Sequence, residues 1–274
     1  MRISNLLGDG TEIDHTMLSN FRDRCLNRQI NEDDEFLKLI QKNFPQIELV
    51  LPRNTITFRA RVFRVNHKVE EDLLFSSMAK AISETNMSGK INLELGLLNA
   101  YKEANERYEK KRFKGFNAKD SFVNLNYQMV ADGRCNHRFS PCLYSANDII
   151  TAISEVRPII ASNISVARIK ALEDLKIINL VSANSNDFVS FVGKFFTQST
   201  TLEHPEVYVY SQGICDFIRS KKYDGIAYPC CQNGGGINYA IFNYSKCKAI
   251  SSEIYTVDEI KIKYKERKIE PRGL

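Results

Sequence analysis

The spacing of apolar and polar positions changes several times along the chain, and each spacing predicts a type of element. Residues 31–44 carry acidic side chains first and then apolar ones three to four positions apart: Phe36, Leu37, Ile40 and Phe44. Such a pattern predicts an amphipathic helix with acids in its first turn. Residues 55–65 alternate apolar and polar side chains and are rich in β-formers, which predicts a strand.

A strand followed by a helix is predicted for residues 140–158. The segment 140–146 is short and apolar, and a helical stripe follows it: Ile149, Ala152, Ile153 and Val156. Ser145, with Asp148 three residues later, matches a capping box at the start of this helix. Pro158 ends the helix, and Glu155 lies on the flank of its apolar stripe.

The second half of the chain mixes strand and helix patterns without a strict βαβ alternation. Strands are expected at 175–183 and 248–257, helices at 187–198 and 205–222, and two β-rich runs joined by a three-glycine loop within 223–243. This mixture predicts an α+β fold, with a mixed, largely antiparallel central sheet and flanking helices.

The same patterns predict three parts. Residues 1–52 form a helical N-terminal extension, and residues 53–260 form the main domain, with a helical insertion at about 71–112. Residues 261–274 form a basic C-terminal tail. Such a tail is most simply a solvated chain end. The alternative, a contact with nucleic acid, would need the tail for binding, and we do not expect nucleic acid as a partner.

Composition narrows the class of protein. The chain has 274 residues, 43% of them hydrophobic and 26% charged, which is typical of a globular protein. No apolar run approaches the roughly 18 residues that span a bilayer, and no secretory signal is visible, so we expect a cytoplasmic protein without a membrane partner. The seven cysteines include no CxxC pair and the four histidines are scattered, so we expect neither a disulfide framework nor a metal site.

Candidate chemistry comes from arginines, a tyrosine and one glutamate. Arg59 and Arg61 lie on one side of the strand predicted at 55–65, and Arg134, Tyr144 and Glu155 follow. Two arginine guanidinium groups can each donate two hydrogen bonds to the oxygens of a pyrophosphate, and a tyrosine ring can stack on a planar cation. A carboxylate can bind ribose hydroxyls and stabilise positive charge at an anomeric carbon. The plainer interpretation is an exposed edge strand carrying charges and a solvated glutamate.

A single carboxylate limits the reaction. Ordinary glycosidases use two carboxylates, one of which protonates a poor leaving group. Nicotinamide leaves NAD⁺ as a neutral molecule, so one carboxylate with phosphate-binding arginines is sufficient to cleave the nicotinamide–ribose bond. Any pyrophosphate-binding cleft would use similar arginines, so the set does not define this reaction alone.

Five segments of the chain resemble, in order, the blocks of the RES domain family, which is named for an arginine, a glutamate and a serine. They are FRAR (58–61), GFNAKDSF (115–122), GRCN (133–136), LYSANDIITAISEVRP (143–158) and YDGIAYPCCQNGGGINYAIF (223–242). The resemblance extends over about residues 55–245. It implies a fold related to ADP-ribosyltransferases and a domain at 53–260 that consumes NAD⁺ by phosphorolysis or hydrolysis. It also implies a toxin held inactive by a cognate antitoxin, with no resident cofactor or metal.

The resemblance assigns roles by position. Arg59 and Arg134 would bind the pyrophosphate, with Arg61 and Asn136 as further substrate-binding residues. Tyr144 would line the nicotinamide pocket, and Glu155 would act on the ribose. Inorganic phosphate would be a co-substrate.

Two positions depart from the family pattern. Cys230 stands where the family's serine usually follows the Tyr-Pro pair, and a thiol is a weaker hydrogen-bond donor of similar size. Cys230 either takes the serine's catalytic and substrate-binding place or leaves the domain with reduced activity. His137 stands where the family often has proline.

Three alternatives stay open at this point. The first is a cysteine hydrolase that uses Cys230 or Cys231 with His137 or His204. The second is a RES relative that binds NAD or another nucleotide without turnover. The third is an ADP-ribosyltransferase that modifies a macromolecule.

Overall fold

The computed structural model describes most of the main domain. The described residues are 13, 15–29, 33–62, 102, 114–123, 126–181, 187–197 and 208–261. The chain divides into two compact units, residues 1–62 with 116–274 and residues 63–115. The helical insertion predicted at about 71–112 falls outside the described residues apart from Lys102, and so does the basic tail from residue 262 onward.

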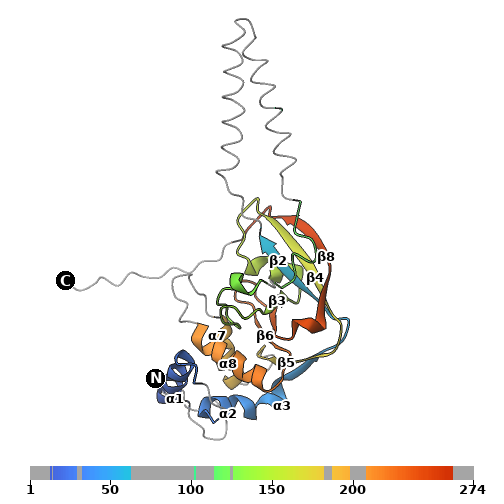
Figure 1. The fold of residues 1–274 in the computed structure, drawn as a ribbon. Helices are drawn as coiled ribbons and strands as arrows, with labels where there is room; N and C mark the ends of the chain where they lie inside the picture. Colours follow the sequence, from blue (N-terminus) through green and yellow to red (C-terminus); the bar gives the residue numbers. More distant parts are fainter. Residues whose placement is uncertain are drawn as a thin grey trace, which may run out of the picture. The chain divides into compact units, whose positions relative to one another are not determined.

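One eight-stranded sheet organises the larger unit, with strands in the order β1-β5-β6-β7-β3-β2-β4-β8 (Figure 1). The strands are β1 Glu48–Leu51, β2 Ile56–Val62, β3 Leu143–Ala146, β4 Asn163–Ala171, β5 Leu175–Asn179, β6 Gly225–Pro229, β7 Ile237–Ile241 and β8 Cys247–Thr256. Neighbours pair antiparallel except β5 and β6, which pair parallel. This confirms the predicted α+β fold with a mixed, largely antiparallel sheet.

Helices α1, α2, α7 and α8 lie together beside β5 and β6 (Figure 1). The described helices are α1 His15–Leu26, α2 Glu35–Lys42, α3 Phe44–Ile47, α6 Ile149–Glu155, α7 Asp187–Thr197 and α8 Val209–Ser220, with short 3-10 segments η1 Tyr127–Met129 and η3 Tyr244–Lys246. None of the helices in the described ranges is long and apolar enough to cross a membrane.

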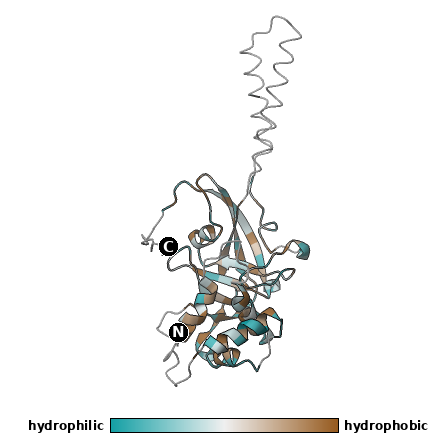
Figure 2. Ribbon diagram, turned by 90° about the vertical axis from the view of Figure 1, so that its left-hand side faces the viewer, coloured by the Kyte–Doolittle hydropathy of each residue, from teal (hydrophilic) through white to brown (hydrophobic). Residues whose placement is uncertain are grey.

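Two apolar clusters pack on the two faces of the sheet. Ile226 and Tyr228 of β6 belong to the cluster that includes the helices, whereas Ala227 between them belongs to the other cluster. Successive side chains of a strand point to opposite faces, so an apolar run such as β6 supplies both layers. Hydrophobic positions accordingly recur along the strands as well as the helices (Figure 2).

The helix predicted at 31–44 is present, but in two pieces. Asp34 is the N-cap of α2, since its carboxylate accepts a hydrogen bond from the Leu37 amide at 3.1 Å. Arg24 of α1 donates to the same carboxylate at 2.6 Å, so the cap also joins the two helices. Phe44 begins α3 and is buried with the α2 stripe.

Strand β2 lies inside the sheet. It pairs with β3 at Phe58 and with β4 along its whole length, from Ile56 to Val62. The interpretation of residues 55–65 as an exposed edge strand is therefore wrong, because strand order is set by long-range pairing that local alternation does not reveal. The arginines of β2 need an explanation other than protection of an edge.

Gly225 allows β6 and β7 to approach closely, which gives a first testable prediction. A Cβ at this position would lie 2.5 Å from the Ala240 carbonyl oxygen and 3.0 Å from the Ile241 Cα. Both are backbone atoms in a paired strand, so Gly225→Ala should cost about 1–3 kcal/mol in the free energy of unfolding. Urea denaturation measures this.

Gly234→Ala is the matched control, because an added Cβ there meets nothing within 4 Å. If the two variants unfold at the same urea concentration, the close packing at Gly225 is not what requires a glycine there.

Candidate active site

Helix α6 is fixed at its first turn by its cap and by the glycine-rich loop. The Asp148 carboxylate accepts hydrogen bonds from the Thr151 amide and hydroxyl, each at 2.7 Å. Asn233 of the loop donates to the Thr151 hydroxyl at 2.9 Å, and a Cβ at Gly236 would lie 2.4 Å from that oxygen. The loop thus packs directly on α6.

The capping box predicted for α6 is wrong. Ser145 belongs to β3, and Asp148 is the N-cap. Serine and aspartate both favour N-cap positions. Because β3 continues through Ala146, α6 can begin only after that residue.

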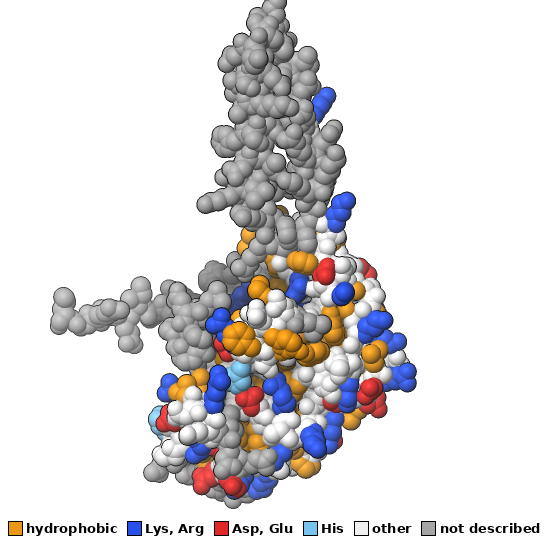
Figure 3. All heavy atoms as spheres, viewed as in Figure 1, with side chains coloured by type: hydrophobic (Ala, Val, Ile, Leu, Met, Phe, Trp, Pro, Cys, Tyr) orange, Lys and Arg blue, Asp and Glu red, His pale blue; other side chains and the backbone are white. Residues whose placement is uncertain are grey.

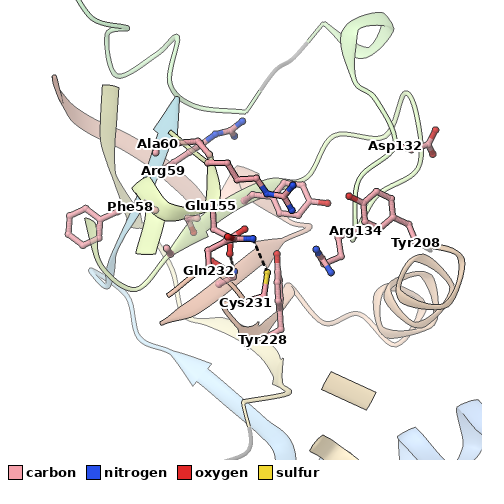
Figure 4. Close-up of a pocket in the computed structure, with 17 residues that line it drawn as sticks. Phe58, Arg59, Ala60, Asp132, Arg134, Glu155, Tyr208, Tyr228, Cys231 and Gln232 are labelled. Carbon is pink, nitrogen blue, oxygen red and sulfur yellow. Dashed lines mark hydrogen bonds between the residues drawn. The ribbon is translucent and has the colours of Figure 1, made fainter. Parts of the chain in front are cut away.

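A cavity of about 500 Å³ opens beside α6. It is lined by four of the predicted site residues: Arg59, Arg134, Tyr144 and Glu155. Figure 4 shows Arg134, Glu155, Tyr208 and Tyr228 around this space, whereas the Phe58 ring points away and lies against Arg168, 5.8 Å from its guanidinium carbon. The volume is in the range of ordinary small-molecule sites.

Glu155 ends α6 and presents its carboxylate to the cavity. Its Oε1 accepts a hydrogen bond from Asn238 Nδ2 of β7 at 2.7 Å and one from the Cys230 thiol at 2.9 Å. Hydrogen bonds from two other segments of the chain therefore fix Oε1 of this carboxylate at the wall of the cavity.

Cys230 connects Glu155 to the glycine-rich loop. Its sulfur accepts the amide hydrogens of Gln232 at 3.3 Å and Asn233 at 3.2 Å while the thiol donates to Glu155. Burial, reinforced by the hydrogen bond to the Glu155 carboxylate, raises the pKa of Cys230 to about 11. The thiol is therefore protonated at neutral pH and can act as a donor, as a serine hydroxyl would.

This arrangement predicts opposite results for two variants of Cys230. Cys230→Ser keeps a donor to Glu155 and an acceptor for the loop amides, so turnover should equal or exceed that of the wild type. Cys230→Ala removes both and should lower kcat/KM about tenfold, as expected for one hydrogen bond to a charged group. Activity measurements on the two variants test both expectations. Equal losses in the two variants would show that the reaction needs the thiol itself.

Arg59 of β2 brings a half-buried cation to the cavity. Its Nη1 is buried and has no hydrogen-bond partner among the described residues. Burial, with the nearby charge of Arg61, lowers the pKa of Arg59 to about 10, so the side chain remains charged at neutral pH. A buried charge without a partner is costly, and an anionic ligand would relieve that cost.

Arg134 reaches the cavity from the opposite side, on a short turn fixed to α8. Its guanidinium carbon lies 5.7 Å from the centre of the Tyr208 ring. Ser211 donates to the Arg134 carbonyl at 2.7 Å, and Gln212 donates to the Gly133 carbonyl at 3.0 Å. The backbone that carries Arg134 is thereby fixed.

Tyr144 contributes its ring to the cavity, because its hydroxyl is occupied. The hydroxyl donates to Asn136 Oδ1 at 2.7 Å and accepts from the Cys135 amide at 2.8 Å. Burial raises the pKa of Tyr144 well above its usual value, which makes it a poor proton donor or acceptor in the reaction. Gly133 permits this contact, since a Cβ there would lie 2.8 Å from the hydroxyl.

Cys230 contacts Glu155 but does not itself line the cavity, and three other sequence candidates lie elsewhere. Asn136 is buried behind Tyr144, and Arg61 lies over the Phe116 ring at 5.6 Å; neither lines the cavity, and their substrate-binding roles stay predictions. His137 is hydrogen-bonded to Asp216 at 2.7 Å, a contact that raises its pKa.

The structure adds polar residues that the sequence did not single out. They are Asp132, Arg157, Tyr208, Tyr228, Gln232 and Asn238, all of which line the cavity. Tyr228 is the tyrosine of the Tyr-Pro pair before Cys230, and Asn238 follows the three glycines, so these motifs could have drawn attention to both. No local signal marks Tyr208.

The fold and the cavity define the class: an α+β domain with a polar cavity that gathers arginines, tyrosines and one positioned carboxylate. Within that class, the chain belongs to the RES domain family, whose model matches residues 106–264, more than half of the sequence. The matched segment contains Arg134, Tyr144, Glu155 and Cys230. Arg59 lies before it, so the family match does not test its assignment to the family's first arginine.

A comparison with curated protein sequences gives no match. Among solved structures, one chain of the M. tuberculosis MbcT–MbcA toxin–antitoxin complex is similar, with 15% identity and a TM-score of 0.32 over 47% of this chain and 74% of that chain.

Proposed function

We propose that this protein cleaves the nicotinamide–ribose bond of NAD⁺ and transfers ADP-ribose to phosphate or water. The observation that carries the proposal is a single carboxylate, Glu155, fixed by Asn238 and Cys230 in a cavity that Arg59 also lines, with an Nη1 atom that has no hydrogen-bond partner among the described residues. Membership of the RES family supports it.

Each group has a chemical task in this reaction. Arg59 and Arg134 bind the pyrophosphate as charge-assisted donors. The Tyr144 ring contacts the cationic nicotinamide. The bond between the anomeric carbon and the ring nitrogen breaks, its electron pair leaves with neutral nicotinamide, and Glu155 stabilises the positive charge on the ribose. An oxygen of phosphate or water then bonds to the same carbon, and water loses a proton in doing so.

The described geometry disfavours a cysteine hydrolase that uses Cys230 as its nucleophile; Cys231, the other thiol considered, lines the cavity. A nucleophilic cysteine has a lowered pKa, whereas that of Cys230 is raised to about 11. The Nε2 atom of His137 is hydrogen-bonded to Asp216, not to a thiol. His204, the other histidine considered, lies outside the described residues.

Proton NMR of NAD⁺ incubated with the purified protein tests the proposal, with and without phosphate. Free nicotinamide is the expected result. ADP-ribose as co-product identifies water as the acceptor, and ADP-ribose 1″-phosphate identifies phosphate. If NAD⁺ persists unchanged under both conditions, the proposal is wrong, and a binding-only domain becomes the better interpretation.

The cellular role proposed with this activity is that of a cytoplasmic toxin controlled by a cognate antitoxin protein. The family resemblance supports this role, and NAD⁺ loss would be its mechanism. Basic side chains on the face shown in Figure 3 are interspersed with acidic and neutral ones, so this face does not suggest a nucleic-acid partner. Growth arrest on expression of the wild type, but not of Glu155→Gln, is the expected outcome.

A further inference from the structure

Two buried side-chain polar atoms lack a hydrogen-bond partner among the described residues, and both belong to residues that line the same cavity. One is Nη1 of Arg59 and the other is Oγ of Ser145, a residue only 7% exposed. Buried polar groups are nearly always paired in folded proteins, so each exception needs an explanation. Because both unpaired atoms belong to residues that line one cavity, a single explanation can account for both.

The strand register brings these two residues together. Strands β2 and β3 pair antiparallel with Phe58 opposite Ala146. Arg59 and Ser145 are the next residues of the two strands on the same side of this pair, and both line the cavity. A guanidinium N–H and a hydroxyl are both donors, so a single acceptor oxygen can satisfy both.

We propose that Ser145 is a substrate-binding residue that, together with Arg59, binds a phosphoryl oxygen in the cavity. The chemistry fits, because a phosphoryl oxygen is a strong, anionic acceptor that suits a guanidinium and a neutral hydroxyl at once. The identity of the ligand rests on the proposed function: the oxygen belongs either to the pyrophosphate of NAD⁺ or to the inorganic phosphate acceptor.

A purely structural Ser145 would behave differently. If its hydroxyl mattered only to folding, its loss would lower stability without changing ligand binding. An orphaned hydroxyl that awaits a ligand costs free energy in the free protein, so its loss should not destabilise the free protein and should weaken the ligand complex. A structural role therefore predicts a lower Tm and an unchanged Kd for Ser145→Ala. A ligand-binding role predicts an unchanged or higher Tm and a higher Kd.

The test compares the wild type with Ser145→Ala in thermal unfolding and in calorimetric binding of inorganic pyrophosphate, ADP-ribose and inorganic phosphate. We expect the Tm of the free variant to be equal or higher, and its Kd for pyrophosphate and ADP-ribose to rise about tenfold or more. If only the Kd for inorganic phosphate rises, the subsite stands and its ligand is the acceptor.

Ser165→Ala is the matched control. Ser165 is also buried in the sheet, but its Oγ already accepts the Phe116 amide hydrogen at 2.8 Å. This variant should lose stability and keep wild-type affinities. The proposal is overturned if Ser145→Ala behaves in the same way, or if the wild type binds none of the three probes.

The test is independent of turnover. Pyrophosphate binding that depends on Ser145, in a protein that leaves NAD⁺ intact, would support the subsite and overturn the proposed function. If Ser145→Ala leaves the turnover of NAD⁺ and the affinity for all three probes unchanged, the proposed function is supported and the subsite is overturned.

Discussion

Glu155→Gln should lower kcat for NAD⁺ cleavage about 100- to 1,000-fold, the loss typical of removing one electrostatic contribution to a transition state. The substitution is nearly isosteric. A glutamine amide oxygen can still accept the hydrogen bonds from Asn238 and Cys230, so the side chain should keep its place. The negative charge is what disappears. KM and Tm should therefore change little.

Steady-state kinetics and thermal unfolding of Glu155→Gln separate these effects. Glu173→Gln is a suitable control, because Glu173 is an exposed carboxylate whose partner is Lys246 at 3.9 Å and which does not line the cavity. A Glu155→Gln protein with more than a tenth of wild-type kcat would contradict the assignment. A large fall in Tm would mean that the charge serves the fold instead.

The part of the site that could be predicted from sequence is the part carried by local pattern. The alternation of residues 55–65 gives β2 with Arg59, and the apolar stripe of α6 puts Glu155 on its flank, where the structure has it. Local pattern did not identify the N-cap of α6, because Ser145 and Asp148 both belong to residue types that favour N-cap positions. The pairing of β3 with β7 includes Ser145 in the strand and leaves Asp148 as the N-cap.

The remainder of the site depends on contacts between distant segments. Asn238 reaches Glu155 from a strand 83 residues further along the chain. Tyr208 contacts Arg134 from the start of α8. Strand order and helix placement determine these contacts, and neither follows from a periodicity of two or 3.6 residues. The same reason explains why β2 could be taken for an edge strand.

Arg59→Met should weaken NAD⁺ binding and, at the same time, stabilise the ligand-free protein. Methionine keeps much of the aliphatic stem and removes the charge. Losing a charge-assisted contact to pyrophosphate should raise KM about 10- to 100-fold. Removing a buried cation whose Nη1 has no partner among the described residues should raise Tm, because the pKa of about 10 shows that burial disfavours the charged form.

The pH dependence of this effect has a definite sign. The pKa of Arg59 in the folded protein, about 10, lies below its usual value of 12.5, so the folded state binds this proton less tightly than the unfolded state. The destabilisation is therefore fully present below about pH 10 and declines as pH rises above it. The Tm advantage of Arg59→Met should be constant from pH 6 to 8.

Ligand-induced stabilisation gives the sharpest measurement for Arg59. Pyrophosphate should raise the Tm of the wild type and have little effect on Arg59→Met, since the anion stabilises by pairing with this cation. Arg138→Met is the control, because Arg138 is exposed, lies 5.1 Å from the Phe139 ring centre and does not line the cavity. An Arg59→Met protein that unfolds at a lower temperature and binds pyrophosphate normally would show that Arg59 serves the core of the sheet and not the ligand.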